Sequence, residues 1–112
     1  MFGFSSPKVP SLTVEEAKSV LDSDSSAVFL DVRTPNEVAK GKIEKSINIP
    51  LDTIGTIESK LAEKSQKIVV YCLSGSRSVQ AVDQMIKLGY TNVFDMKGGL
   101  LTWRGKRLPT TS

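Results

Sequence analysis

Residues 68–77 read IVVYCLSGSR, and this stretch decides the fold of the 112-residue chain. The apolar run at 68–71 is typical of a buried strand, and the small residues after it indicate a tight loop that leads into a helix. Backbone N–H groups in such a loop, together with the positive end of the helix, attract anions. The stretch therefore predicts that Cys72 lies in a ring of N–H groups that stabilises its thiolate over its thiol.

Short apolar runs and amphipathic segments alternate along the rest of the chain. Thr13 and Glu16 form a capping box at the start of one helix, and Thr34 and Glu37 form a second one. We expect helices at 14–21, 35–41, 54–64 and 79–86, and strands at 27–32, 47–49, 68–71 and 92–95. This order is typical of an α/β domain whose mainly parallel sheet is covered by helices on both faces.

Two polar segments directly follow predicted strands. Asp31 and Arg33 lie at the end of one strand, and Cys72 and Arg77 lie in the loop after another. In open parallel sheets, ligands bind beyond the carboxyl ends of the strands. A cation such as Arg77 in the first turn of a helix opposes the helix dipole, which indicates a role beyond contact with solvent. We therefore expect a functional site at this edge of the sheet.

The composition excludes several classes of site. Cys72 is the only cysteine and histidine is absent, which excludes a Cys-His couple, a Ser-His-Asp triad, a histidine-ligated zinc and a disulfide within the monomer. The net charge of +3, with both signs interspersed, mildly favours anionic partners, and no basic stripe points to nucleic acid. The apolar run 68–73 is too short to span a membrane and residues 1–10 lack the features of a leader. We expect a cytoplasmic protein with no membrane partner, provided that no leader was removed.

Four separated motifs resemble those of the single-domain rhodanese-like sulfurtransferases. In chain order they are Phe29, Leu30, Asp31, Val32 and Arg33 with Glu37; Gly41, Ile43, Ile47, Asn48, Ile49 and Pro50; Val70, Tyr71 and Cys72 with Gly75, Arg77 and Ser78; and Gly98, Gly99 and Trp103. The loop from Cys72 to Arg77 is the most specific of them. The chain departs from the family pattern at Lys42, where histidine is usual, and at Lys45 and Ser46, where Gly-Ala is common.

The resemblance covers residues 11–103 and implies a three-layer α/β domain with a mainly parallel central sheet of about five strands. It divides the chain into an N-terminal tail at 1–10, a rhodanese-like domain at 11–105 and a C-terminal tail at 106–112. We expect both ends of the chain to be loose.

The resemblance also implies thiosulfate sulfurtransferase activity. The Cys72 thiolate would attack the outer sulfur of thiosulfate or another sulfane donor, form a persulfide and release sulfite. A thiol or cyanide would then remove the sulfur. The expected partners are a small anionic sulfur donor, a thiol or cyanide acceptor and a protein of a sulfur relay, with no metal and no organic cofactor. Because the chain has no second cysteine, another molecule must resolve the persulfide.

The site residues fall into three groups. Cys72 is the expected nucleophile. The expected substrate-binding residues are Leu73, Ser74, Gly75, Ser76, Arg77 and Ser78, and the expected supporting residues are Asp31, Arg33 and Trp103. Arg77 is expected either to orient the anionic donor or to hold the loop through the loop's own carbonyl groups. Asp31 and Arg33 are expected to support the neighbouring loop through ion pairs, and Trp103 either to line the pocket or to belong to the core.

Two other functions fit the same sequence. Cys-loop phosphatases and arsenate reductases also hold a tetrahedral oxyanion in a cysteine loop that ends in arginine. Their loops have one residue more than the four between Cys72 and Arg77, so this ring is one amide short for phosphate. A non-catalytic interaction module with the same fold is the second alternative, which the presence of Cys72 disfavours.

Overall fold

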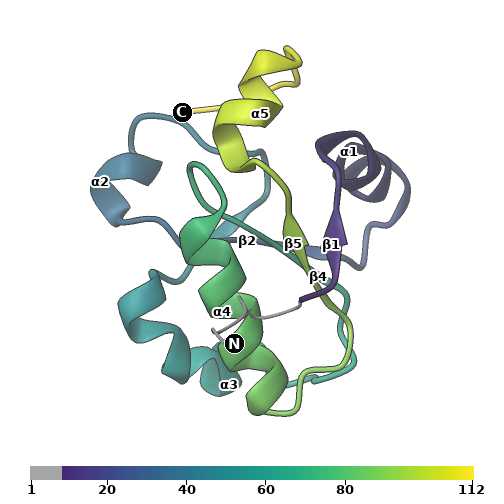
Figure 1. Ribbon diagram of the computed structural model, residues 1–112, viewed down its shortest axis with the longest axis vertical. Coiled ribbons are helices and arrows are strands. Elements are labelled where there is room, and N and C mark those ends of the chain that lie inside the picture. Colours follow the sequence, from purple (N-terminus) through teal and green to yellow (C-terminus); the bar gives the residue numbers. More distant parts are fainter. Residues whose placement is uncertain (1–8) are drawn as a thin grey trace, which may run out of the picture.

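Five short strands form one sheet, in which every neighbouring pair is parallel (Figure 1). The computed structural model describes residues 9–112. The strands are β1 Ser11–Leu12, β2 Val28–Asp31, β3 Ile47–Asn48, β4 Ile68–Tyr71 and β5 Val93–Met96, in the spatial order β1-β5-β4-β2-β3. The predicted α/β class is therefore confirmed, and the sheet is parallel throughout. Most of the expected N-terminal tail lies outside the described residues.

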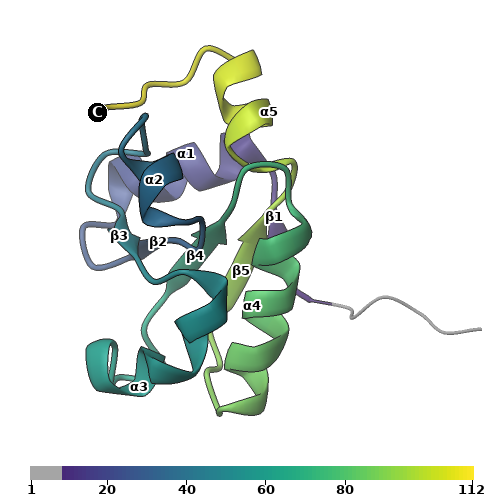
Figure 2. The ribbon, with the colours of Figure 1, turned by 90° about the vertical axis from the view of Figure 1, so that its left-hand side faces the viewer.

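Helices cover both faces of this sheet, as Figures 1 and 2 show. They are α1 Val14–Ser23, α2 Pro35–Val38, the 3-10 helix η1 Leu51–Thr56, α3 Ile57–Lys60, α4 Ser76–Lys87 and α5 Gly99–Gly105. One core lies between the sheet and α4, α3 and η1, and a second core lies between the sheet and α1 and α5. Neighbouring strand residues point to opposite cores, so that Val70 lies in the first and Val69 in the second. The central strands are apolar on both faces because both faces are covered.

The two capping boxes form as the sequence indicates. The side chain of Thr13 accepts a hydrogen bond from the N–H of Glu16, and the side chain of Thr34 accepts one from the N–H of Glu37. In each box the glutamate carboxylate accepts the N–H of the threonine in return. The second box fixes the start of α2, the short helix that follows the carboxyl end of β2.

Three elements differ from the sequence-based expectation. The single helix expected at 54–64 is instead η1 followed by one turn of α3, with Thr53 outside helical geometry (φ −118°, ψ 17°). The strand β1 has only two residues, too few to show a pattern in the sequence. Helix α5 was not expected, because it begins at Gly98 and Gly99, and glycine disfavours helix formation.

The C-terminal segment is attached to the domain, so the expectation that it is loose is wrong for residues 108–111. Thr111 pairs with Lys42 through two backbone hydrogen bonds of 2.8 Å. The buried indole of Trp103 donates to the Pro109 carbonyl at 2.9 Å, and Leu108 packs against the second core. A buried indole N–H needs an acceptor, and this segment provides it.

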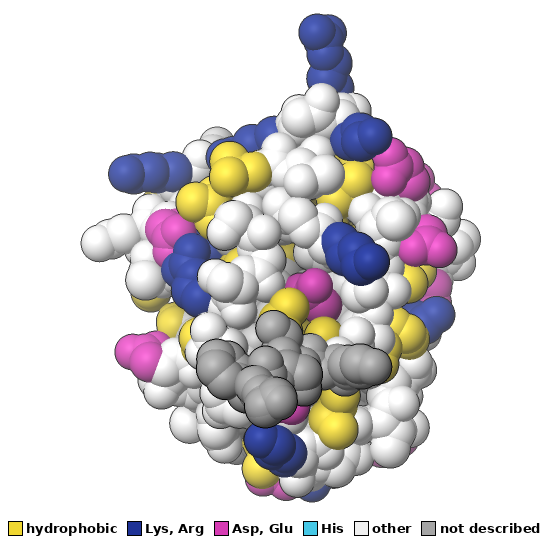
Figure 3. Space-filling model, viewed as in Figure 1, with side chains coloured by type: hydrophobic (Ala, Val, Ile, Leu, Met, Phe, Trp, Pro, Cys, Tyr) yellow, Lys and Arg dark blue, Asp and Glu magenta, His cyan; other side chains and the backbone are white. Residues whose placement is uncertain are grey.

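The described part of the chain contains no helix with the length and apolarity that a membrane crossing requires. On the face drawn in Figure 3, basic and acidic side chains are interspersed.

Candidate active site

The Cys72 side chain lies at the carboxyl end of β4, where the loop 72–75 leads into α4. Its Sγ accepts the backbone N–H of Gly75 at 3.0 Å and that of Ser78 at 3.3 Å. Within the described residues the other loop amides form no hydrogen bond with Sγ. Gly75 has a φ of +116°, a conformation that glycine adopts without steric cost, and this turn aims its N–H at the sulfur. Partial positive charge from these two N–H groups therefore converges on Sγ.

Helix α5 holds this loop from the other side. The N–H groups of Leu100 and Leu101 donate to the carbonyls of Cys72 at 2.9 Å and Leu73 at 3.0 Å. The turn comes this close because Gly99 has no side chain: a Cβ there would lie 2.5 Å from the Leu73 carbonyl oxygen. Gly99 therefore shapes the cysteine loop from a distant part of the chain, a role that the sequence analysis did not assign.

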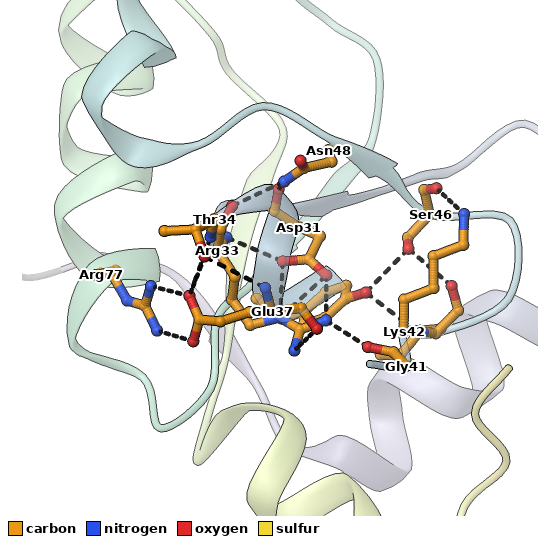
Figure 4. Close-up of polar contacts among 11 residues, drawn as sticks. Asp31, Arg33, Thr34, Glu37, Gly41, Lys42, Ser46, Asn48 and Arg77 are labelled. Carbon is orange, nitrogen blue, oxygen red and sulfur yellow. Dashed lines mark hydrogen bonds and ion pairs between the residues drawn. The ribbon is translucent and has the colours of Figure 1, made fainter. Parts of the chain in front are cut away.

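Arg77 does not bind the carbonyl groups of its own loop, so the second of the two roles expected for it is wrong. Its guanidinium forms a bidentate pair with Glu37, with Nη1–Oε1 at 2.7 Å and Nη2–Oε2 at 2.9 Å (Figure 4). The hydrogen bonds from Arg77 hold the pKa of Glu37 at about 2. Both side chains are about one-third exposed. The pair joins the start of α4 to α2, and it gives Glu37 a second partner beside its role in the capping box.

Asp31 and Arg33 form a buried ion pair behind this contact. Arg33 Nη2 lies 2.7 Å from Asp31 Oδ2, and both side chains are almost fully buried. The same guanidinium donates to the carbonyl of Gly41 at 2.7 Å and to that of Glu37 at 3.3 Å (Figure 4). Asn48 adds two hydrogen bonds, to the carbonyls of Asp31 and Arg33. Through these hydrogen bonds the buried pair holds the segment that carries Glu37, the partner of Arg77.

The other expected site residues lie in different surroundings. Trp103 is fully buried in the second core. Leu73 packs against the same core, whereas Ser74 and Ser76 are exposed at the surface of the loop. Trp103 therefore lies in the core, which was the second of the two roles expected for it.

Ser78 connects Cys72 to an acidic side chain that the sequence analysis missed. Its Oγ lies 3.4 Å from Cys72 Sγ and donates to Asp95 Oδ1 from β5. Asp95 is only 4% exposed, and burial raises the pKa of its carboxyl group. A carboxylate in the apolar run VFDM of the last strand is the signal that would have found it.

A hollow of about 280 Å³ lies beside Arg77 and is mostly apolar. Its lining residues are Val32, Thr34, Pro50, Leu51, Asp52 and Arg77. They come from the segments after β2 and β3 and from the start of α4, so the hollow opens at the carboxyl edge of the sheet, where ligands bind in such folds. Within residues 9–112, no group of three or more Cys, Asp or Glu side chains is arranged to hold a metal ion.

The pair between Glu37 and Arg77 predicts a pH-dependent stability. The pKa of Glu37 is about 2 in the folded chain and 4.5 for a free glutamate. The contribution of Glu37 to the free energy of unfolding is therefore fully present above about pH 4.5 and is lost as the pH falls towards 2. We expect Glu37→Gln to lower the free energy of unfolding by about 1 kcal/mol at pH 7, because the pair is partly exposed. Urea unfolding between pH 7 and pH 2 measures the free energy of unfolding of both proteins. The difference between Glu37→Gln and wild type should shrink on acidification.

The exposed Glu63 provides the control, since Glu63→Gln should change the free energy of unfolding little at any pH. A Glu37→Gln deficit that stays constant down to pH 2 would show that the ion pair does not stabilise the fold.

Comparison with known proteins gives consistent matches. The family model described as Rhodanese-like domain matches residues 13–106. A protein named Sulfurtransferase, from Allochromatium vinosum, is 35% identical over 82 residues, which cover 73% of this chain and 76% of that protein. One named Putative thiosulfate sulfurtransferase, mitochondrial, from Schizosaccharomyces pombe, is 39% identical over 98 residues, covering 74% and 67%. The crystal structure of a rhodanese-related protein from Thermoplasma volcanium superposes with a TM-score of 0.80 at 31% identity, covering 91% of this chain and 97% of that one.

Proposed function

Because the chain belongs to the family of rhodanese-like sulfurtransferases, we propose that it moves a sulfane sulfur through a persulfide on Cys72. The donor is thiosulfate or a persulfide, and the acceptor is a thiol or cyanide. The observation that carries the proposal is the position of Cys72 Sγ, which accepts two backbone N–H groups at the carboxyl edge of the sheet. This arrangement stabilises a sulfur anion without a neighbouring histidine.

The transfer has two steps. In the first, the Cys72 thiolate attacks the outer sulfur of thiosulfate; a bond forms between Sγ and that sulfur, and the bond to the sulfonate sulfur breaks. Sulfite leaves with the electron pair, so the persulfide anion and sulfite carry the same total charge as the thiolate and thiosulfate. In the second step, cyanide or a thiolate attacks the outer sulfur and Cys72 leaves as a thiolate.

Arg77 and the hollow beside it support an anionic donor. The guanidinium is paired with one carboxylate, yet it is about one-third exposed and has N–H donors beyond the two used by Glu37. Its charge attracts an anion towards the loop, while the apolar lining of the hollow accommodates the rest of a small acceptor. Ser74 and Ser76 are exposed next to Cys72, where a protein acceptor of a sulfur relay can contact them.

Intact-mass analysis tests the proposal. Incubation with thiosulfate should add the mass of one sulfur atom, about 32 Da, and cyanide should remove it and release thiocyanate. The protein has a single cysteine, so the mass shift reports on Cys72 alone. An unchanged mass after treatment with thiosulfate and with an organic persulfide would contradict sulfur transfer.

Phosphate-ester hydrolysis is the alternative chemistry of a cysteine loop ending in arginine. Four residues separate Cys72 from Arg77, and two N–H groups converge on Sγ, which leaves few donors for the equatorial oxygens of a phosphoryl group. In the same preparation we expect no hydrolysis of p-nitrophenyl phosphate. Efficient hydrolysis together with an unchanged mass after thiosulfate treatment would favour the phosphatase assignment.

A further inference from the structure

We propose that Asp95 is the internal proton acceptor of Cys72 and that the Ser78 hydroxyl passes the proton between them. The inference rests on the proposed role of Cys72 as nucleophile, and it names the group that takes the thiol proton in a chain without histidine. Ser78 contacts the reacting sulfur directly, whereas Asp95 acts through Ser78 and is therefore a positioning residue.

The three side chains form a continuous hydrogen-bonded row. Cys72 Sγ donates to Ser78 Oγ at 3.4 Å, and Ser78 Oγ donates to Asp95 Oδ1, with the Gly75 carbonyl at 3.2 Å as its second acceptor. Cys72 and Ser78 are fully buried and Asp95 is 4% exposed, so water does not compete for these contacts. The residues come from the end of β4, the first turn of α4 and β5, which pack side by side. Such a row has two proton arrangements with the same heavy-atom positions.

The proton moves without changing the net charge of the row. In the first arrangement Cys72 is a thiol and Asp95 is a carboxylate, which accepts the Ser78 hydroxyl. The thiol proton then passes to Ser78 Oγ while the Ser78 hydroxyl proton passes to Asp95, which leaves a thiolate and a carboxylic acid. Each arrangement carries one negative charge, so burial penalises both in a similar way. Only the second one holds the nucleophile that sulfur transfer needs.

The groups around the row favour the thiolate arrangement. The N–H groups of Gly75 and Ser78 lie against Sγ, and the positive charge of Arg77 attracts a negative charge on Cys72. At the other end, burial favours the neutral form of Asp95, while the hydrogen bond from Ser78 and the charge of Lys97 in the turn after β5 favour its charged form. From β1, Ser11 pairs with Asp95 through the backbone and brings no charge to it. The N–H groups and Arg77 therefore offset part of the free-energy cost of burying a negative charge on Sγ.

The pH profile of alkylation reports on this proton transfer, because iodoacetamide reacts with the thiolate alone. In wild type we expect a plateau between about pH 5.5 and 7.5, where the rate changes by less than about twofold, because the row holds one proton throughout. In Asp95→Asn no second group shares the proton, so the rate should follow a single titration step instead of two steps separated by a plateau.

Further variants separate the transfer from a structural role. Ser78→Ala should narrow the plateau, because it removes the hydrogen bonds that couple the two groups, and adding Asp95→Asn should leave a single titration step. Asp83→Asn, which removes a partly exposed carboxylate from the same helix as Ser78, should keep the plateau. A wild-type profile without a plateau, or an Asp95→Asn profile with one, would overturn the proposal.

Carbon-13 NMR of the Asp95 carboxyl provides a second readout that needs no folded Asp95 variant. The carboxyl should titrate in two steps in wild type and in one step in Cys72→Ala, because the second step belongs to the coupled thiol. Identical titrations would overturn the proposal. Both measurements omit the sulfur donor, so their outcome is independent of the thiosulfate mass test.

Discussion

Replacement of Cys72 by serine is expected to abolish sulfur transfer. The serine hydroxyl ionises far less readily than a thiol and cannot form a persulfide, so neither step of the reaction has a nucleophile or a leaving group. We expect thiocyanate formation to fall by at least about a thousandfold and the thiosulfate-dependent mass increase to disappear. A coupled measurement of thiocyanate release and intact mass on the same sample checks both.

A matched variant makes this result specific to the sulfur. Ser59→Ala changes an exposed side chain on α3 whose hydroxyl donates to the carbonyl of Thr56 at the end of η1, and it should retain the wild-type activity. Far-ultraviolet circular dichroism should show the same fold for both variants, since cysteine and serine differ little in volume. A Cys72→Ser protein that still forms thiocyanate would show that Cys72 is not the nucleophile.

The sheet and the cysteine loop could be predicted because their signals are local. The run at 68–71 is apolar throughout and became the central strand β4, which is buried on both faces. Gly75 lies in the short loop after a predicted strand, and it takes the positive φ that a tight turn before a helix needs. Glycines also lie at the start of α5, and there they made the helix hard to predict, because glycine disfavours helix formation. Gly99 is needed at that position because a side chain would collide with the Leu73 carbonyl.

The contacts that complete the site could not be predicted because they join distant parts of the chain. Glu37 and Arg77 are 40 residues apart, and Ser78 and Asp95 are 17 apart. Each residue has a sufficient local explanation: Glu37 closes a capping box, and Ser78 lies in the first turn of a helix. The position of Arg77 in a first helical turn and of Asp95 in an apolar strand indicates that each has a partner, but the sequence does not indicate which residue it is. The packing of α2 and β5 against the start of α4 creates those partners, and only the structure shows it.

The buried pair of Asp31 and Arg33 is expected to dominate the stability of this edge of the sheet. Asp31→Asn leaves the Arg33 guanidinium, which is 3% exposed, without its counter-charge. An uncompensated buried charge of this kind destabilises a fold by roughly 3–5 kcal/mol, a large fraction of the stability of a domain of this size. We therefore expect Asp31→Asn to lower the free energy of unfolding by that amount in urea at pH 7.

The exposed pair of Asp22 with Lys18 provides the comparison, since Asp22→Asn should lower the free energy of unfolding by less than about 1 kcal/mol. Removing both charges in Asp31→Asn/Arg33→Met should recover part of the loss, because no charge then remains buried. Arg33 also binds the carbonyls of Glu37 and Gly41, so the double variant should stay below wild type. If Asp31→Asn destabilised the protein no more than Asp22→Asn, the buried pair would not be what holds the segment of Glu37 in place.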